Sequence, residues 1–209
     1  MTPEDLARRL DDLHETDRAA VRLIAEGPRV VPALVRFLLD GPRLLPQPRI
    51  AAAEALAAIG GEEAREGLLR ALGLLDTPIG SPALRLSEEA VSNAAAACLA
   101  RFPSEDVVPA LRAAFRRHRL IGAAEALSRI GDEDCVPDFV EAFEDDFYRT
   151  RLLDVLERYG SVALAAATAV LARPVSALEG KLGAKRRDAC RRFLAGTKAE
   201  TGRSGRTEE

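Results

Sequence analysis

Apolar residues along the chain recur at the spacing of an amphipathic helix. Val136, Phe139, Val140 and Phe143 follow one another at i, i+3, i+4 and i+7, a stripe typical of one helix face. No stretch alternates apolar and polar residues at the period of two that a half-buried strand needs. The pattern therefore predicts an all-α protein.

The same spacing predicts about twelve helices arranged as antiparallel pairs. The first begins where Thr2 can cap a helix and Pro3 fits its first position. The others are expected at 17–26, 28–40, 48–59, 62–75, 88–102, 105–117, 119–130, 133–144, 147–159 and 161–172, with one or two more within 175–195.

Part of this pattern is an internal repeat. The segments 52–72, 95–115 and 123–143 align without a gap, with "AAEALAAIGGEEA", "AAACLARFPSEDV" and "AAEALSRIGDEDC" at their starts. The spacing is 43 residues from Ile59 to the equivalent Phe102, 28 residues from Phe102 to Ile130, and 29 residues from Ile130 to Tyr159. The first spacing is longer because of a turn-rich insertion at 76–87. Small residues on the first helix of each copy allow close packing, so the repeat predicts stacked helix pairs.

The repeated pattern "AAEALxxIGDEDxVPxFVEAF" resembles the short HEAT-like repeats of bacterial proteins, which also occur in phycobilisome lyases. The resemblance extends over 17–195 and is strongest between 50 and 160. Arg49 and Arg149 match the basic residue that often precedes the Ala-rich helix. The resemblance implies an α-solenoid of about six helix pairs over 1–195, with the Ala-rich helices on its concave side. The polar segment 196–209 is expected to be a disordered tail.

Composition narrows the class of protein. Aromatic residues make up 4% of the 209 residues, charged residues 30%, and the formal net charge is -3. This balance provides no general attraction to nucleic acid or to anionic membranes. No apolar run reaches the roughly 18 residues that a membrane-spanning helix needs. Three cysteines do not suggest a disulfide framework. We therefore expect a protein of the cytoplasm, in a cell of bacterial type.

Reactive side chains are few. Some HEAT-like hydroxylases hold two irons with several His-Glu pairs, but this chain has 2 histidines and a single such pair, His14-Glu15. Cys98 and Cys135 occupy positions where other copies have alanine, and Cys190 continues an apolar stripe. We therefore interpret the three cysteines as core residues. The sequence predicts no catalytic residue, no metal site and no cofactor.

A basic C-terminal region raises one alternative. The segment 181–209 contains nine Lys or Arg and four Asp or Glu residues. HEAT-like DNA-binding and base-excision proteins grip DNA with a basic concave face. Here the expected concave helices carry charges of both signs and the chain has no Trp. We therefore do not expect a nucleic-acid partner.

The favoured function is a non-enzymatic scaffold or adaptor that binds a protein partner, with a lyase-like or maturation-chaperone role as the first alternative. Two sets of residues are candidates for partner binding. The first set lies on the expected concave surface: Arg49, Glu54, Glu125, Arg129, Arg149, Asp154 and Arg158. The second set lies in the long connections 40–48 and 76–87: Leu44, Leu45, Ile79 and Leu84, with Leu86 beside them. These connections either fold back to cap the first repeats or form a joint docking edge.

Overall fold

The computed structural model describes residues 2–174 and 180–204, with side chains as far as Gly196, and shows only helices and turns in these ranges. Contacts divide the chain into two compact units, Met1–Ile130 and Gly131–Glu209. None of the helices in the described ranges is long and apolar enough to cross a membrane. The prediction of an all-α protein is confirmed.

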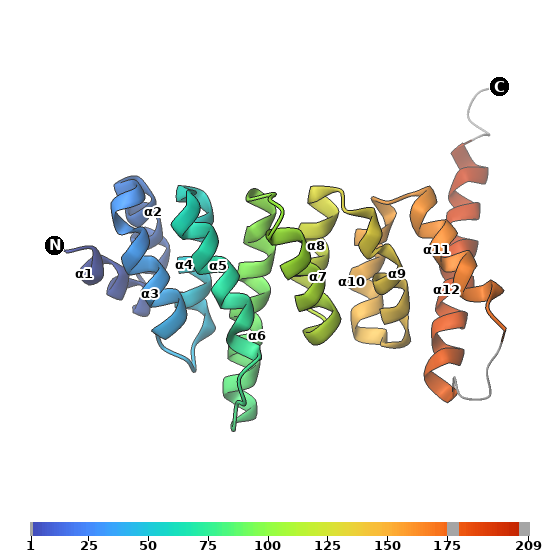
Figure 1. Ribbon diagram of the computed structural model, residues 1–209, viewed down its shortest axis with the longest axis horizontal. Helices are drawn as coiled ribbons and strands as arrows, with labels where there is room; N and C mark the ends of the chain where they lie inside the picture. Colours follow the sequence, from blue (N-terminus) through green and yellow to red (C-terminus); the bar gives the residue numbers. More distant parts are fainter. Residues whose placement is uncertain (1, 175–179, 205–209) are drawn as a thin grey trace. The chain divides into compact units, whose positions relative to one another are not determined.

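The first unit contains eight of the helices drawn in Figure 1. They are α1 (Pro3–Arg8), α2 (Thr16–Glu26), α3 (Val31–Asp40), α4 (Pro46–Ile59), α5 (Glu62–Leu72), α6 (Pro82–Cys98), α7 (Val107–His118) and α8 (Ile121–Ile130). The second unit contains α9 (Val136–Glu141), α10 (Asp146–Glu157), α11 (Ser161–Ala172) and α12 (Gly180–Ser204). Short 3-10 turns extend several of these helices.

The helices of the first unit form two layers. Helices α2, α4, α6 and α8 lie side by side in one layer, and α3, α5 and α7 pack against α4, α6 and α8 from the other. Close approach in the first layer depends on small residues. At Gly122 of α8, a Cβ atom would lie 2.0 Å from the backbone oxygen of Asn93 in α6. The Ala-rich helices thus pack as the repeat predicts.

The start of α6 differs from the sequence prediction. Helix α6 begins at Pro82 and not at residue 88, so the second half of the expected insertion is helical. Pro82 occupies the first turn, where its missing N–H costs no hydrogen bond, and Ala83 to Leu86 are good helix formers. As a result α6, in green, reaches lower in Figure 1 than the other helices of its unit.

The two ends of the chain compare differently with the sequence prediction. At the N-terminus, the Thr2 hydroxyl accepts a hydrogen bond from the Asp5 N–H at 3.1 Å, and the Asp5 carboxylate accepts one from the Thr2 N–H at 3.2 Å. This reciprocal cap confirms the expected helix start. At the C-terminus, α12 continues to Ser204 and residues 205–209 lie outside the described residues. The disorder expected for 196–209 therefore stays a prediction.

Candidate functional site

The projecting end of α6 and the loop 41–45 before α4 meet at one edge of the first unit. The guanidinium Nε of Arg43, in the loop, donates a hydrogen bond to Oε1 of Glu88 in α6 at 2.6 Å. An ion pair thus joins the first long connection to α6, the helix that begins within the second one. The sequence did not single out Arg43 for this role.

A buried arginine completes this junction. A terminal nitrogen of Arg49 in α4 lies 2.9 Å from Oε2 of Glu88, and Arg49 Nε donates to the Leu38 carbonyl at 2.7 Å. Both side chains are 0% exposed. Burial raises the pKa of Glu88, but hydrogen bonds from Arg49 and Arg43 outweigh it, so the pKa lies below its ordinary value. Arg49 is therefore inside the protein and cannot contact a partner, contrary to the expectation from sequence.

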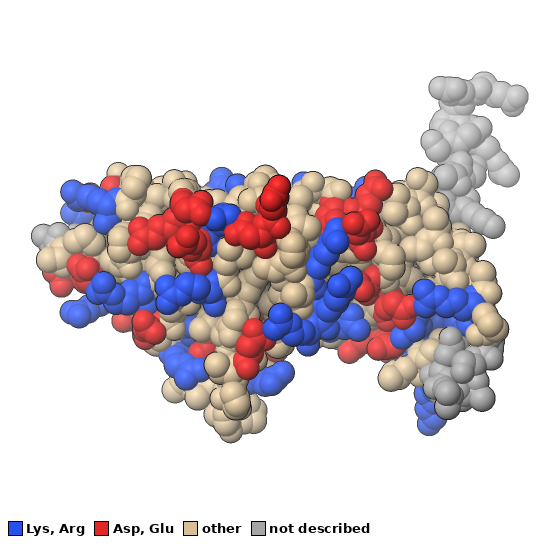
Figure 2. Space-filling model, viewed as in Figure 1, with Lys and Arg blue, Asp and Glu red and all other residues tan. Residues whose placement is uncertain are grey.

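Large apolar side chains near this junction in the sequence are exposed or half-buried. Leu44 is 69% exposed, Leu45 51% and Leu86 68%, while Ile79 and Leu84 are half-buried. We call these five leucine and isoleucine residues the apolar edge. In Figure 2 the projecting end of the first unit is largely uncharged, with charged side chains above it and on its flanks. Leu44 and Leu45 do not fold back over the first repeats as a cap.

The reason for the exposure of Leu86 lies in helix geometry. Asn93 faces α8, because its side-chain oxygen accepts a hydrogen bond from the Gly122 N–H at 2.8 Å. Leu86 lies seven residues earlier, on the same face of α6. Helix α8 begins only at Ile121, so it covers this face at Asn93 and leaves it bare at Leu86. The insertion in the repeat thus extends α6 past its neighbour.

The other sequence candidates lie on two separate surfaces. Glu54 and Arg129 are exposed and line a shallow depression over α4, α6 and α8, whose floor is formed by alanines and Cys98. Glu125 is half-buried on α8. The remaining three candidates, Arg149, Asp154 and Arg158, belong to the second unit at α10 and its end. Whether any of these residues binds a partner stays a prediction.

Two of the three cysteines, Cys98 and Cys190, lie in surroundings that disfavour their thiolate forms. Burial and the nearby Glu54 raise the pKa of the Cys98 thiol to about 11, although Arg101 and Arg129 act in the opposite direction. Burial likewise raises the pKa of Cys190 to about 11, against the charges of Arg186 and Arg187. The Cys135 thiol is buried and donates to the Asp132 carbonyl at 2.8 Å. Each thiol is therefore suited to packing more than to nucleophilic chemistry.

Metal-binding side chains do not gather in the part of the chain that the structure describes. No group of three or more His, Cys, Asp or Glu residues there could hold a metal ion. His14 is exposed at a turn, where its backbone N–H donates to the Asp12 carboxylate at 3.0 Å. His118 contacts the Asp76 carboxylate through Nε2 at 3.0 Å. The two histidines thus lie at different places in the first unit.

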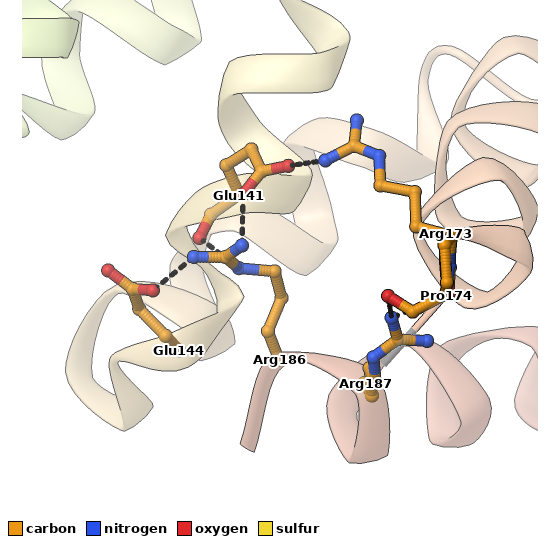
Figure 3. A network of polar contacts seen from close by, with 6 residues as sticks. All are labelled: Glu141, Glu144, Arg173, Pro174, Arg186 and Arg187. Atoms are coloured by element: carbon orange, nitrogen blue, oxygen red, sulfur yellow. Dashed lines mark hydrogen bonds and ion pairs between the residues drawn. The ribbon is translucent and has the colours of Figure 1, made fainter. Parts of the chain in front are cut away.

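Two basic residues of the C-terminal region hold the second unit together, as Figure 3 shows. Arg186 of α12 forms ion pairs with Glu141 and Glu144, and Glu141 also accepts a hydrogen bond from Arg173 at 2.6 Å. Arg187 is buried and donates to the backbone carbonyls of Arg173 at 2.7 Å and Leu171 at 3.2 Å. These two arginines are therefore engaged in structural contacts.

Comparison with known proteins identifies the repeats. Residues 48–73 and 120–145 each match the family model described as PBS lyase HEAT-like repeat. The first match covers α4 and α5, and the second covers α8, α9 and the turn between them. No curated protein matches the chain.

Proposed function

We propose that this chain, which is all-α in the described residues and contains two segments that match a HEAT-like repeat, is a non-enzymatic scaffold that docks a protein partner on its apolar edge. Repeat scaffolds bury one helix pair against the next and leave the surfaces of the stack for binding. The fold alone does not identify a function, so the proposal depends on the site.

One observation carries the proposal. Leu44, Leu45 and Leu86 are each more than half exposed, yet they lie on segments that the Arg43–Glu88 ion pair joins. Exposed apolar side chains scattered singly need no explanation, whereas a group held on a fixed framework indicates an interaction site. A partner that covers these leucines would gain the free energy of burying apolar surface without having to order the loop first.

The test is affinity capture from the source cells with two variants matched for exposure. The edge variant combines Leu44→Ser, Leu45→Ser and Leu86→Ser. The control variant combines Leu13→Ser and Val21→Ser, which are 55% and 69% exposed elsewhere in the first unit. A protein captured by the wild type and the control, but lost with the edge variant at unchanged melting temperature, supports the proposal. Capture that survives in the edge variant contradicts it.

A lyase-like or maturation-chaperone role is the second candidate, because the matching repeat model carries the description PBS lyase. Co-expression with a phycobiliprotein subunit and its bilin tests this role. Bilin attachment that depends on the chain, seen as absorbance on the denatured subunit, supports it. Equal attachment with and without the chain excludes it.

A further inference from the structure

The connection 76–81, which precedes α6, is tied to helix α7 at its first residue. Oδ1 of Asp76 accepts a hydrogen bond from a terminal nitrogen of Arg117 and contacts Nε2 of His118, each at 3.0 Å. Arg117 and His118 are the last two residues of α7. The Thr77 hydroxyl, by contrast, bonds within the turn just before the connection. The Asp76 carboxylate is therefore the side chain that links this connection to another helix in the described part of the chain.

The two contacts of Asp76 differ in their response to pH. An arginine stays charged at all these pH values, whereas a histidine ordinarily changes its charge between pH 5 and 8. The hydrogen bond from His118, and then the charge of Arg117, hold the pKa of Asp76 below its ordinary value in spite of partial burial. Asp76 is thus ionised near neutral pH and can only accept, so Nε2 of His118 must carry the proton in this contact.

The surroundings of His118 contain one opposite charge at contact distance. Helix α7 packs against α5 and α8. Among the residues that line the cleft of about 210 Å³ between α5 and α7, the ionisable ones are Asp76, Arg117 and His118. The basic residue in the last turn of α5, Arg70, is exposed and does not line the cleft. Helix α8 has no charged residue before Glu125.

The other cations of α7 and its end are engaged in contacts of their own. Arg112 and Arg116 each have an interaction partner. Arg119 lies over the ring of Phe115, at 5.5 Å from its centroid. The charge that a protonated His118 meets first is therefore the carboxylate of Asp76.

We propose that the Asp76–His118 contact is a pH-sensitive latch, which holds the connection 76–81 on α7 more firmly when the imidazole of His118 is protonated. A hydrogen bond between two charged groups is about twice as strong as one between neutral groups. Protonation also places a second cation beside Arg117. The side chain of Arg117 is 59% exposed and that of His118 15%, so water weakens this repulsion more than it weakens the contact with Asp76.

The latch concerns a segment of the apolar edge, because Ile79 lies within 76–81. Acidification would thus fix the position of one edge residue, whether or not a partner docks there. The inference goes beyond the proposed function and is tested on the protein alone, so a failure of partner capture leaves its test unaffected.

The test is limited proteolysis of the full-length protein with a protease of broad specificity, with cleavage within 76–81 located by mass spectrometry. The cleavage rate follows the population in which the segment is released. His118→Gln can still donate a hydrogen bond to Asp76 but cannot become charged. Dividing the rate of the wild type by that of the variant cancels the pH dependence of the protease. We expect a ratio near unity at about pH 7.5 and a ratio lower by about two- to fivefold at about pH 5.5, as exposed charge pairs allow.

Two further variants assign the effect. His14→Gln removes the other of the 2 histidines, at an exposed turn, and should be cleaved as the wild type is at both pH values. Asp76→Asn removes the acceptor charge, so adding His118→Gln to it should no longer change the response to pH. A ratio independent of pH, a ratio that rises on acidification, or a pH response that persists in the Asp76→Asn background overturns the latch. Resistance of 76–81 to cleavage in every variant also overturns it, because the contact then does not control the segment.

Discussion

Glu88 is the residue on which the proposed docking edge depends, because it pairs with Arg43 and with the buried Arg49. Glu88→Gln should lower the free energy of unfolding by about 3–5 kcal/mol, since it leaves an uncompensated charge inside the protein. Glu89→Gln, at a neighbouring half-buried position, is the control and should cost little. Urea denaturation measures both, and equal stabilities for the two variants would show that the pair is unimportant.

The same pair makes a prediction about pH. The pKa of Glu88 is lower in the folded protein than its ordinary value of 4.5. The carboxylate therefore contributes stability that is fully present above about pH 4.5 and is lost as pH falls through the folded pKa. The difference in unfolding free energy between wild type and Glu88→Gln should thus be constant near neutral pH and shrink on acidification. A difference that grew below pH 4.5 would contradict this linkage.

The cysteines offer a chemical check at the same scale. With a pKa of about 11, Cys98 and Cys190 have very little thiolate at pH 8, and Cys135 is buried. A thiol reagent such as iodoacetamide should therefore label the native protein slowly and all 3 cysteines rapidly in urea. Mass spectrometry counts the labels. Fast native labelling of Cys98 would indicate a reactive thiol and refute its interpretation as a packing residue.

The sequence predicted single residues well where a local pattern decides their place, and poorly where a distant partner does. Thr2 and Pro3 were recognised because a helix start is a local feature. Arg49 was expected on a surface, as charged residues usually are. Its burial requires Glu88, which belongs to the next copy of the repeat and lies far away along the chain. No local signal in the sequence reveals such a pairing.

At the scale of helices, close packing of α6 against α8 depends on Gly122. A Cβ atom there would lie 2.0 Å from the Asn93 oxygen and 3.1 Å from the Ala97 nitrogen. Gly122→Ala should therefore push the helices apart and cost about 1–3 kcal/mol or more of stability. Gly80→Ala is the control, because nothing lies within 4 Å of its added methyl group. Thermal unfolding compares them, and a Gly122→Ala protein as stable as the wild type would disprove the tight contact.

Most helices could be predicted, as the repeat could, because apolar residues recur at a regular spacing along the chain. The start of α6 was missed because "DTPIGSPALRLS" begins with turn residues, although Pro82 is compatible with a first helical turn. A groove between α10 and α12 could not be foreseen. Leu153 and Phe193 line it from two helices that are not consecutive in the chain, and periodicity within one helix contains no information about such a pair.

At the scale of the whole molecule, the division into two compact units can be tested directly. In the first unit, α1 to α8 pack against one another around their own buried leucines and alanines. We therefore expect residues 1–130 alone to fold, with a helical circular dichroism spectrum and one cooperative thermal transition. A fragment without cooperative unfolding would show that the first unit needs the rest of the chain.

The fragment also provides a stricter test when it is combined with Glu88→Gln. Stability in repeat proteins is approximately the sum of the repeats and of the interfaces between nearest neighbours. Arg43, Arg49 and Glu88 all belong to the first unit. Glu88→Gln should therefore cause the same loss of unfolding free energy in the 1–130 fragment and in the full chain. For the full chain, the loss is measured on the transition in which the first unit unfolds. The two losses should agree within about 0.5 kcal/mol. A larger loss in the full chain would mean that the contacts of Glu88 with Arg43 and Arg49 stabilise more than their own unit, and that the two units unfold as one.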